Sequence, residues 1–446
     1  MPEQTPPPPP NPNLPDANPP QPSQQLPYSL STLGIHGDDP INSATDVAPP
    51  LHVSTTFRYP SDPTLLKPIA DLGLADRNPT APAPADSHVY SRATAPNASR
   101  LELILTQLLG GAPCLTYSSG LAAFHALLVY LNPKVVAIGA GYHGCHGVLE
   151  IYQKLTKCKI VDLFDETSWD NEAEGWSLGK GDVVHLETPV NPTGKAFDIR
   201  YFAERAHARG ASLTVDATFA PPPLLDPFRF GADFVMHSGT KYFGGHSDLL
   251  CGVVGVSKQR DGWERDYWGM FGERIHLGAV MGNMEGWLGV RSLRTLELRV
   301  LRQSESAGKL VWFLHKAVSG EDESEEGKAV RAVVASVEHA SLQAEDMARG
   351  EDGKVGWLKE QMPNGFGPVF GMHLKKAEFA KRLPSKLDLF HHATSLGGVE
   401  SLIEWRSMSD STVAQTLVRV SVGIENWEDL KRDVVDGCKA LAAEST

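Results

Sequence analysis

Lys241 is the residue of this sequence with the clearest chemical potential, because small and hydroxyl-bearing residues surround it in HSGTKYFGGHSD, residues 237–248. Lysine side chains are usually placed in water. A lysine that forms a Schiff base instead needs partial desolvation, which lowers the pKa of its amine, and small neighbours that leave room for an aldehyde. The hydroxyls of Ser238 and Thr240 could also donate hydrogen bonds to a phosphate. The alternative is an ordinary loop lysine after a strand, which this segment alone does not exclude.

Two further polar residues follow apolar strands of the predicted sheet. Asp216, in VDATFAPP (residues 215–222), lies at the carboxyl end of a strand, where open α/β sheets bind their ligands. A carboxylate buried there requires a cationic partner, and a protonated pyridine nitrogen would supply one. Asn191, in ETPVNPTG (residues 187–194), could hydrogen-bond a ring hydroxyl. An aspartate that caps the next turn and a plain turn at Asn191 remain alternative explanations.

A helix start and an aromatic loop complete the set of candidate residues. Ser118, Ser119 and Gly120 open a predicted helix in TYSSGLAAFHALL, and its free amides and dipole suit a phosphate, although an ordinary helix start fits the same residues. Tyr142 follows the next strand. One cofactor with a phosphate, an aromatic ring, a phenolic oxygen, a ring nitrogen and an aldehyde would use every candidate, and pyridoxal phosphate has all five groups.

The elements that must position these residues alternate along the chain. Short β-branched runs begin at Val135, Lys159, Asp182, Ser212, Asp233 and Cys251, and helical stretches separate them. This alternation predicts an α/β fold, with a mostly parallel sheet covered on both faces. Residues 99–109 predict a helix that ends at two glycines, and residues 278–314 predict a long helix that leads into a smaller C-terminal α+β domain.

The remaining segments predict how the chain is divided. Residues 1–28 form a proline-rich segment that is expected to be disordered, because it has too few apolar groups to offset its ordering entropy. Residues 29–62 are expected to form an arm, extended from residue 35 to residue 57. Residues 63–295 are expected to form the large domain and residues 296–446 the small domain. The charged run GEDESEEGK, from residue 320, predicts a surface loop.

Composition restricts the partners of the protein. The formal net charge of −13 argues against nucleic acids and anionic membranes, which require basic patches. The five cysteines are few and scattered, so a reducing compartment is expected. No apolar run approaches the ~20 residues that a membrane span needs, and the N-terminus lacks the pattern of a secretory signal. The predicted protein is cytoplasmic and acts on a small molecule.

The sequence resembles the cystathionine γ-synthase/γ-lyase family of trans-sulfuration enzymes, the Cys/Met-metabolism pyridoxal-phosphate enzymes. The resemblance runs from about His36 to near the C-terminus. It rests on GADFVMHSGTKYFGGHSD, VDATFA, ETPVNPTG, SSGLAA, the SLGGVESL run from Ser395 and LVRVSVGIEN from Leu417. It implies the type I, aspartate-aminotransferase-like fold of pyridoxal-phosphate-dependent transferases.

The resemblance also implies a role for each matching residue. Lys241 would carry the cofactor as a Schiff base and then act as acid and base, with Tyr142 stacked on the ring. The cofactor would be held by Asp216, Asn191, the amides of Gly120 and Leu121, and the hydroxyls of Ser238 and Thr240. Tyr90 and Arg92 would reach the phosphate of a neighbouring subunit, which implies a homodimer or a homotetramer. Arg419 and Ser395 would bind the α-carboxylate of the substrate.

Several positions differ from the residues that are usual in the family. Ala217 replaces an asparagine, and Thr394 stands where γ-synthases and γ-lyases often have glutamate and β-lyases have tyrosine. The tyrosine loop reads Tyr-His-Gly-Cys-His from Tyr142, and Glu-Trp-Arg-Ser-Met-Ser from Glu404 replaces a Pro-Ala-x-Met-Thr-His type of segment. The last three of these changes are expected near the distal end of the substrate, and Thr394 is expected to contact it. No metal is expected, because His143, Cys145 and His146 lack a fourth ligand at a sensible spacing.

The resemblance favours γ-replacement on an activated homoserine ester by a thiol such as cysteine, as in methionine biosynthesis and cysteine metabolism. The alternative within enzymes is a lyase that cleaves cystathionine or a related thioether. The alternative outside enzymes is a pseudoenzyme that serves as an interaction subunit, against which the presence of Lys241, Asp216, Asn191 and Arg419 argues.

Overall fold

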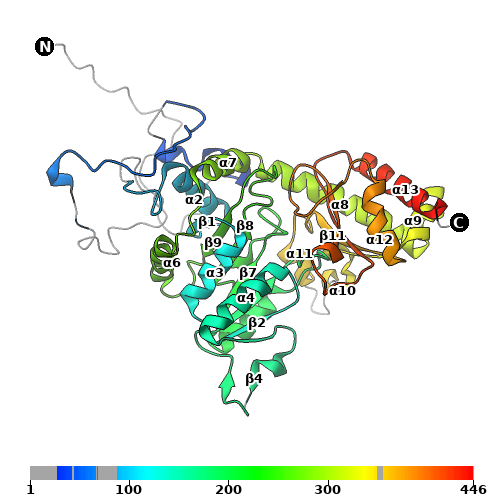
Figure 1. The fold of residues 1–446 in the computed structure, drawn as a ribbon, viewed down its shortest axis with the longest axis horizontal. Coiled ribbons are helices and arrows are strands. Elements are labelled where there is room, and N and C mark those ends of the chain that lie inside the picture. Colours follow the sequence, from blue (N-terminus) through cyan, green and yellow to red (C-terminus); the bar gives the residue numbers. More distant parts are fainter. Residues whose placement is uncertain are drawn as a thin grey trace.

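The computed structural model describes residues 28–42, 45–66, 68, 88–171, 173–348 and 355–444. Two sheets organise these residues, and Figure 1 shows them in separate lobes that helix α8 (Leu296–Ser319) connects. The proline-rich segment and most of residues 67–87 lie outside the described residues. The division of the chain at residues 28, 62 and 295 therefore stays a prediction.

The large lobe is built on a seven-stranded, mostly parallel sheet, as the alternating pattern predicts. The strand order is β1 (Cys114–Tyr117), β9 (Gly252–Val256), β8 (Phe234–Ser238), β7 (Ser212–Asp216), β6 (Val183–Glu187), β2 (Val135–Ile138) and β3 (Lys159–Asp162). The five strands from β8 to β3 are parallel, and β9 runs antiparallel to both of its neighbours. All six predicted strands are present. Strand β1, which has four residues and lies directly before the predicted helix start, was not predicted.

Helices cover both faces of this sheet, because the buried strands are apolar on both sides. One face packs against α3 (Gly120–Leu131), α4 (His143–Thr156) and α6 (Trp263–Leu277). The other packs against α2 (Pro96–Leu108), α5 (Ile199–Ala208) and α7 (Asn283–Leu293). The carboxyl ends of the parallel strands stay uncovered by these helices and form the edge that carries the site.

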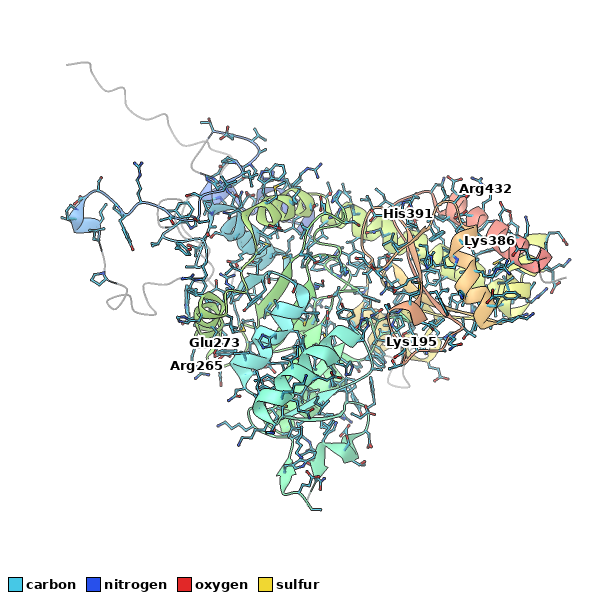
Figure 2. All side chains as sticks on the ribbon, in the orientation of Figure 1. Lys195, Arg265, Glu273, Lys386, His391 and Arg432 are labelled. Atoms are coloured by element: carbon cyan, nitrogen blue, oxygen red, sulfur yellow. The ribbon has the colours of Figure 1, made fainter. Side chains whose placement is uncertain are left out.

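The small lobe contains a five-stranded sheet with the order β10 (Val334–Glu338), β11 (Val369–Leu374), β14 (Leu417–Ser421), β13 (Leu402–Trp405) and β12 (His391–His392). Only β12 and β13 pair in parallel within it. Helices α8, α9 (Glu325–Val333), α12 (Ala377–Arg382) and α13 (Trp427–Ala443) enclose a separate apolar core against this sheet. Lys195 of the large lobe donates to Glu338 at 2.6 Å across the junction, where Figure 2 labels it.

Short elements complete the described residues. They are α1 (Leu30–His36), β4 (Asp170–Asn171), β5 (Trp176–Ser177), α10 (Ala344–Met347), α11 (Trp357–Gln361), and 3-10 helices at Asp39–Ile41, Pro63–Leu65, Glu166–Trp169, Pro227–Phe230, Ala340–Leu342, Leu383–Lys386 and Arg406–Met408. Among the described residues, no helix combines the length and the apolar character that crossing a membrane requires.

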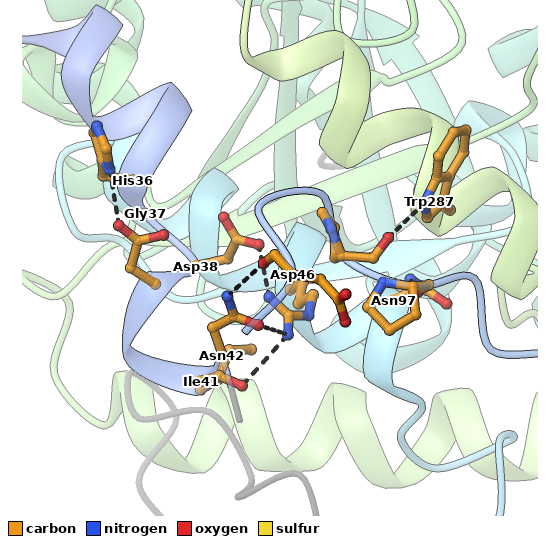
Figure 3. Close-up of polar contacts among 12 residues, drawn as sticks. His36, Gly37, Asp38, Ile41, Asn42, Asp46, Asn97 and Trp287 are labelled. Carbon is orange, nitrogen blue, oxygen red and sulfur yellow. Dashed lines mark hydrogen bonds and ion pairs between the residues drawn. The ribbon is translucent and has the colours of Figure 1, made fainter. Parts of the chain in front are cut away.

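The arm departs from the predicted extended form at its start. Residues 30–36 form α1, and a 3-10 turn follows before the chain becomes extended. The Arg100 guanidinium of α2 holds the arm, since it donates to Asp38 at 2.9 Å and to Asn42 at 3.0 Å, and Figure 3 labels both of these acceptors. Further along, Trp287 of α7 donates to the carbonyl of Pro49 at 2.8 Å. Helices α2 and α7 therefore supply the polar groups that hold the arm.

Two other sequence predictions are wrong in detail. The helix expected over residues 278–314 does not begin at Gly278, which ends α6 with a φ of +68°, and it is divided into α7 and α8 at Arg294 and Thr295. The loop expected from residue 320 contains the start of α9. There the Ser324 hydroxyl accepts a hydrogen bond from the Gly327 amide at 3.0 Å and caps the helix, and the acidic residues of the first turn add to its stability through the helix dipole.

Candidate active site

The carboxyl edge of the large sheet brings three predicted site residues together. Asp216 ends β7, Ser238 ends β8, and Asn191 follows β6 by four residues. Because these strands are parallel neighbours, their carboxyl ends meet at one edge. Helix α3 begins beside this edge, since a Cβ added to Gly120 would lie 2.9 Å from the Cβ of Ser238.

Asp216 is a buried carboxylate without a described basic partner. Its Oδ1 accepts hydrogen bonds from the amide and the hydroxyl of Thr218, at 2.9 and 2.6 Å. Burial raises the pKa of Asp216, and the bonds from Thr218 oppose that rise. The carboxylate therefore costs desolvation energy that a cation on the ring side would offset.

Glu187 lies opposite Asp216 on the neighbouring strand and was not selected from the sequence. Burial, followed by the charge of Asp216, raises the pKa of Glu187 to about 8. Its two oxygens accept the amides of Tyr142 and Asn191, each at 2.7 Å. Glu187 therefore fixes the backbone of both loops that carry predicted cofactor contacts.

Lys241 lies three residues beyond β8, and its Nζ donates to the hydroxyl of Ser395 at 2.7 Å. Burial, followed by the charge of Arg419, lowers the pKa of Lys241 to about 8. Ser395 has a φ of +81°, a conformation that side chains other than glycine rarely adopt. The small-domain loop also approaches closely at Gly397, where a Cβ would lie 2.9 Å from the Lys241 carbonyl carbon. Residues of both lobes therefore bury the amine of Lys241.

Only some of the groups that are predicted to bind phosphate are free of other hydrogen bonds. Ser119 caps α3, with its hydroxyl accepting the amide of Ala122 at 3.1 Å, which leaves the amides of Gly120 and Leu121 at the helix start. The Thr240 hydroxyl is engaged by the backbone of Cys251, to whose carbonyl it donates at 3.3 Å. Its predicted bond to a phosphate would replace or share that contact.

The predicted residues Tyr142, Tyr90, Arg92 and Thr394 are the more exposed ones. Tyr142 is 38% exposed at the start of α4, and Tyr90 is 42% exposed. The guanidinium of Arg92 lies over the Tyr90 ring, 5.0 Å from its centroid, and Tyr90 pairs with Thr56 of the arm. These contacts place Tyr90 and Arg92 with the arm rather than at Lys241. Thr394 is exposed, directly before Ser395.

Arg419 occupies the other side of the site, on β14. Its Nη1 donates to the Asn191 side-chain oxygen at 3.1 Å, and its Nη2 donates to the Ser395 carbonyl at 2.9 Å and to Glu404 at 2.6 Å. Burial lowers the pKa of Arg419 to about 10, while the charge of Glu404 acts in the opposite direction. Arg419 therefore joins the small-domain strands to the Asn191 loop.

Glu404 and Arg406 form the part of the site whose roles the sequence did not reveal. Glu404 faces Arg419 on the neighbouring antiparallel strand and also accepts from Arg406 and Ser409, at 2.9 and 2.6 Å. A polar residue inside the apolar strand Leu402–Trp405 was the available signal. Among the described residues, no group of histidine, cysteine, aspartate and glutamate side chains is arranged to hold a metal ion.

These groups fit pyridoxal phosphate. Asp216 offers an uncompensated buried carboxylate for a ring nitrogen, and Lys241 offers an amine of lowered pKa for an aldehyde. The start of α3 offers free amides for a phosphate. The close approach of Gly120 to Ser238 keeps this edge clear of side-chain atoms. The assignment of individual residues to cofactor atoms stays a prediction.

Comparison with known proteins gives consistent matches. Residues 31–439 match the family model of the Cys/Met metabolism PLP-dependent enzymes. A cystathionine beta-lyase of Lactococcus lactis subsp. cremoris is 32% identical over 77% of this chain and 87% of its own length. A cystathionine gamma-synthase/O-acetylhomoserine (thiol)-lyase of Bacillus subtilis is 28% identical over 92% of this chain and 96% of its own. The crystal structure of cystathionine gamma-lyase from yeast matches with a TM-score of 0.74 at 28% identity, covering 94% of this chain and 99% of that one.

Proposed function

This chain belongs to the Cys/Met metabolism PLP-dependent enzymes, and we propose that it catalyses γ-replacement, joining an activated homoserine ester to a thiol such as cysteine. The pyridoxal-phosphate-dependent trans-sulfuration chemistry follows from the family. One observation carries the extension to this site: Ser395 contacts both the amine of Lys241 and the guanidinium of Arg419. An amine that can exchange with an amino group thus lies beside a group that can bind an α-carboxylate.

The cofactor, when bound, supplies an electron sink for negative charge that develops next to the amino group of the substrate. Arg419 would hold the substrate carboxylate through its planar fork, which lysine cannot reproduce. Lys241, as a free amine with a pKa of about 8, can accept a proton at Nζ and return it near neutral pH. Asp216 would present its negative charge to the ring nitrogen, and Ser395 would keep Nζ directed toward the substrate.

A carbon–sulfur lyase is the second candidate, because relatives named as beta-lyase and gamma-lyase match at 32% and 30% identity. Both outcomes use the same amine, carboxylate and guanidinium. The difference must therefore arise from residues near the distal end of the substrate, among which we place Thr394.

The proposal includes an assembly of at least two copies, in which Tyr90 and Arg92 reach the phosphate of the neighbouring subunit. The support is their exposure and their position beside the arm, away from Lys241 of the same chain. Light scattering of the purified holoenzyme measures this directly, and a monomer that retains full activity would contradict it.

A paired assay tests the function. Purified holoenzyme is incubated with O-acetyl- or O-succinylhomoserine plus cysteine, and separately with cystathionine. We expect cystathionine to form in the first reaction. Pyruvate or 2-oxobutyrate from cystathionine, with no cystathionine made from either ester, would select a lyase instead. A protein that stays colourless after pyridoxal phosphate is added would remove the enzymatic interpretation altogether.

A further inference from the structure

We infer that Arg406 is a positioning residue that holds Glu404, so that Arg419 stays available for the carboxylate of the substrate. The inference rests on the proposed role of Arg419 and adds a residue for which the resemblance implies no role. Arg406 begins the 3-10 helix directly after β13, and its side chain is buried.

The geometry is a carboxylate shared between two guanidiniums. Glu404 Oε2 accepts from Arg419 Nη2 at 2.6 Å and from Arg406 Nη1 at 2.9 Å. Its other oxygen accepts from the Ser409 hydroxyl at 2.6 Å, and Ser409 also accepts from Arg406. Glu404 is therefore held by Arg406 at the oxygen that also binds Arg419, and by Ser409 at its other oxygen. Arg419 keeps a second nitrogen, Nη1, whose contact is the neutral amide of Asn191.

Charge balance explains why the second arginine is needed. When a substrate carboxylate binds Arg419, it shares that guanidinium with Glu404, while Arg406 faces both Glu404 and the buried carboxylate of Asp410. Without Arg406, two carboxylates would share one guanidinium in a buried site, which is strongly unfavourable. Asp410, whose carboxylate lies 3.8 Å from Arg406, is acidic and supplies no positive charge that could replace Arg406 at Glu404. Arg406 thus offsets the negative charge of Glu404 while the substrate binds.

The other contacts of Arg406 do not account for it as a structural residue. Among the described residues, no acceptor lies within hydrogen-bonding distance of its Nε and Nη2 atoms, although both are buried. The buried Arg299 behaves differently, since it donates to the carbonyls of Tyr242 and Ser292 and to the Thr295 hydroxyl. Arg299 ties backbone segments together, whereas the short contacts of Arg406 are with Glu404 and its partner Ser409.

Equilibrium binding to the holoenzyme tests the inference without turnover. L-alanine has an amino group and a carboxylate but no leaving group, and its binding is followed by the visible absorbance of the cofactor. We expect Arg406→Met to raise the Kd for L-alanine by roughly 10- to 100-fold, the effect of losing a hydrogen bond to a charged group. The Kd for L-alaninol, which has no carboxylate, should change less than about threefold, on the order of the context-dependent scatter of single contacts.

Two further variants make the test specific. Glu404→Gln removes the charge that Arg406 holds, so Glu404→Gln/Arg406→Met should bind L-alanine within about threefold of Glu404→Gln alone, as coupled residues require. Arg406→Lys keeps the charge and should recover part of the affinity. If Arg406→Met does not fold, the double variant and Arg406→Lys carry the test. Arg432→Met, a surface arginine on α13 labelled in Figure 2, is the matched control for a lost guanidinium.

The possible outcomes distinguish a failure of this inference from a failure of the proposed function on which it rests. Equal losses for L-alanine and L-alaninol, or a double variant as weak as Arg406→Met, would overturn the role of Arg406. If Arg419→Met leaves L-alanine binding unchanged, the carboxylate role of Arg419 fails, and with it the inference. A large effect of Arg419→Met with none of Arg406→Met would reject only the inference. Where the paired assay identifies a substrate, Arg406→Met should raise KM and leave kcat nearly unchanged.

Discussion

The two lobes contribute buried charge to the site in different ways. At the strand edge of the large lobe, Glu187 and Asp216 are neighbouring carboxylates with raised pKa values, bonded by backbone amides and by Thr218. On strands β13 and β14 of the small lobe, Glu404 is matched by Arg419 and Arg406. Among the described residues, no basic side chain forms an ion pair with the two carboxylates of the first region, whereas in the second region Glu404 and Asp410 are paired with Arg419 and Arg406. The cofactor side is thus completed by what binds, and the substrate side by the fold.

Lys241 connects the two regions, and its loss should have the largest effect. Lys241→Ala removes the amine that both the Schiff base and proton transfer require, so no turnover should be measurable. The visible absorbance band and the adduct trapped by borohydride should also disappear. A Lys241→Ala protein that keeps the trapped adduct would show that another amine carries the cofactor.

Asp216→Asn tests whether the negative charge of Asp216 lacks a cationic partner when no cofactor is bound. In the holoenzyme the substitution breaks a buried ion pair, which costs about 3–5 kcal/mol, and kcat should fall on the order of 10²- to 10³-fold. In the apoenzyme the same change removes an unpaired buried charge, so the melting temperature should stay or rise. A fall in both forms would mean that the carboxylate is already compensated without cofactor.

The stability of the apoenzyme should depend on pH, because the pKa of Asp216 differs between the folded and the unfolded protein. The pKa of Asp216 is raised on folding, so the folded state holds a proton that the unfolded chain has released. Its contribution is fully present below the unfolded pKa of about 3.9 and is lost as pH rises through the folded value. Asp216→Asn should flatten that part of the stability profile, measured by urea unfolding at several pH values.

Arg419→Lys probes the balanced region. Lysine keeps the positive charge that matches Glu404 but loses the planar fork, so folding should survive while KM for the amino acid rises roughly 10- to 100-fold. The melting temperature and the cofactor absorbance serve as controls. An unchanged KM would show that the substrate carboxylate binds elsewhere.

The pKa of Lys241 predicts a smaller, graded effect. With a pKa of about 8, the amine is mostly protonated at pH 7, and the initial rate of pyridoxal phosphate uptake by apoenzyme should rise about tenfold between pH 7 and pH 9. Glu404 raises this pKa and Arg419 lowers it. Glu404→Gln should therefore move the midpoint to lower pH, and Arg419→Met should move it to higher pH. A profile identical in all three proteins would contradict the coupling between the lobes.

Substitutions of Thr394 should leave cofactor binding and stability unchanged, because Thr394 is exposed beside the site and contributes to neither charged region. Thr394→Glu and Thr394→Tyr should keep the cofactor absorbance and the melting temperature. They should change the ratio of replacement to elimination products by at most about 200-fold, which is the upper end of the range for a single pocket contact. A loss of cofactor absorbance would place Thr394 at the cofactor instead of the distal end of the substrate.

The sequence by itself determined the parallel sheet and the residues at its edge. Six apolar strands separated by helices leave few arrangements, and a polar residue directly after such a strand must lie at the carboxyl edge. Asp216, Asn191 and Lys241 could be selected for that reason, because the signal is local. Errors in the fold arose where a single cap decided the outcome, as at Gly278 and Ser324.

Only the tertiary structure decided which charges meet. Glu187 binds the backbone amides of Tyr142 and Asn191, and strand pairing brings it beside Asp216. Neither contact is visible in its own segment of sequence, which resembles an ordinary turn. Glu404 faces Arg419 because β13 and β14 pair antiparallel in one particular register. A shift of one residue would turn Glu404 to the other face of the sheet. Register and domain packing depend on contacts between distant residues, and a local pattern of residue types cannot encode them.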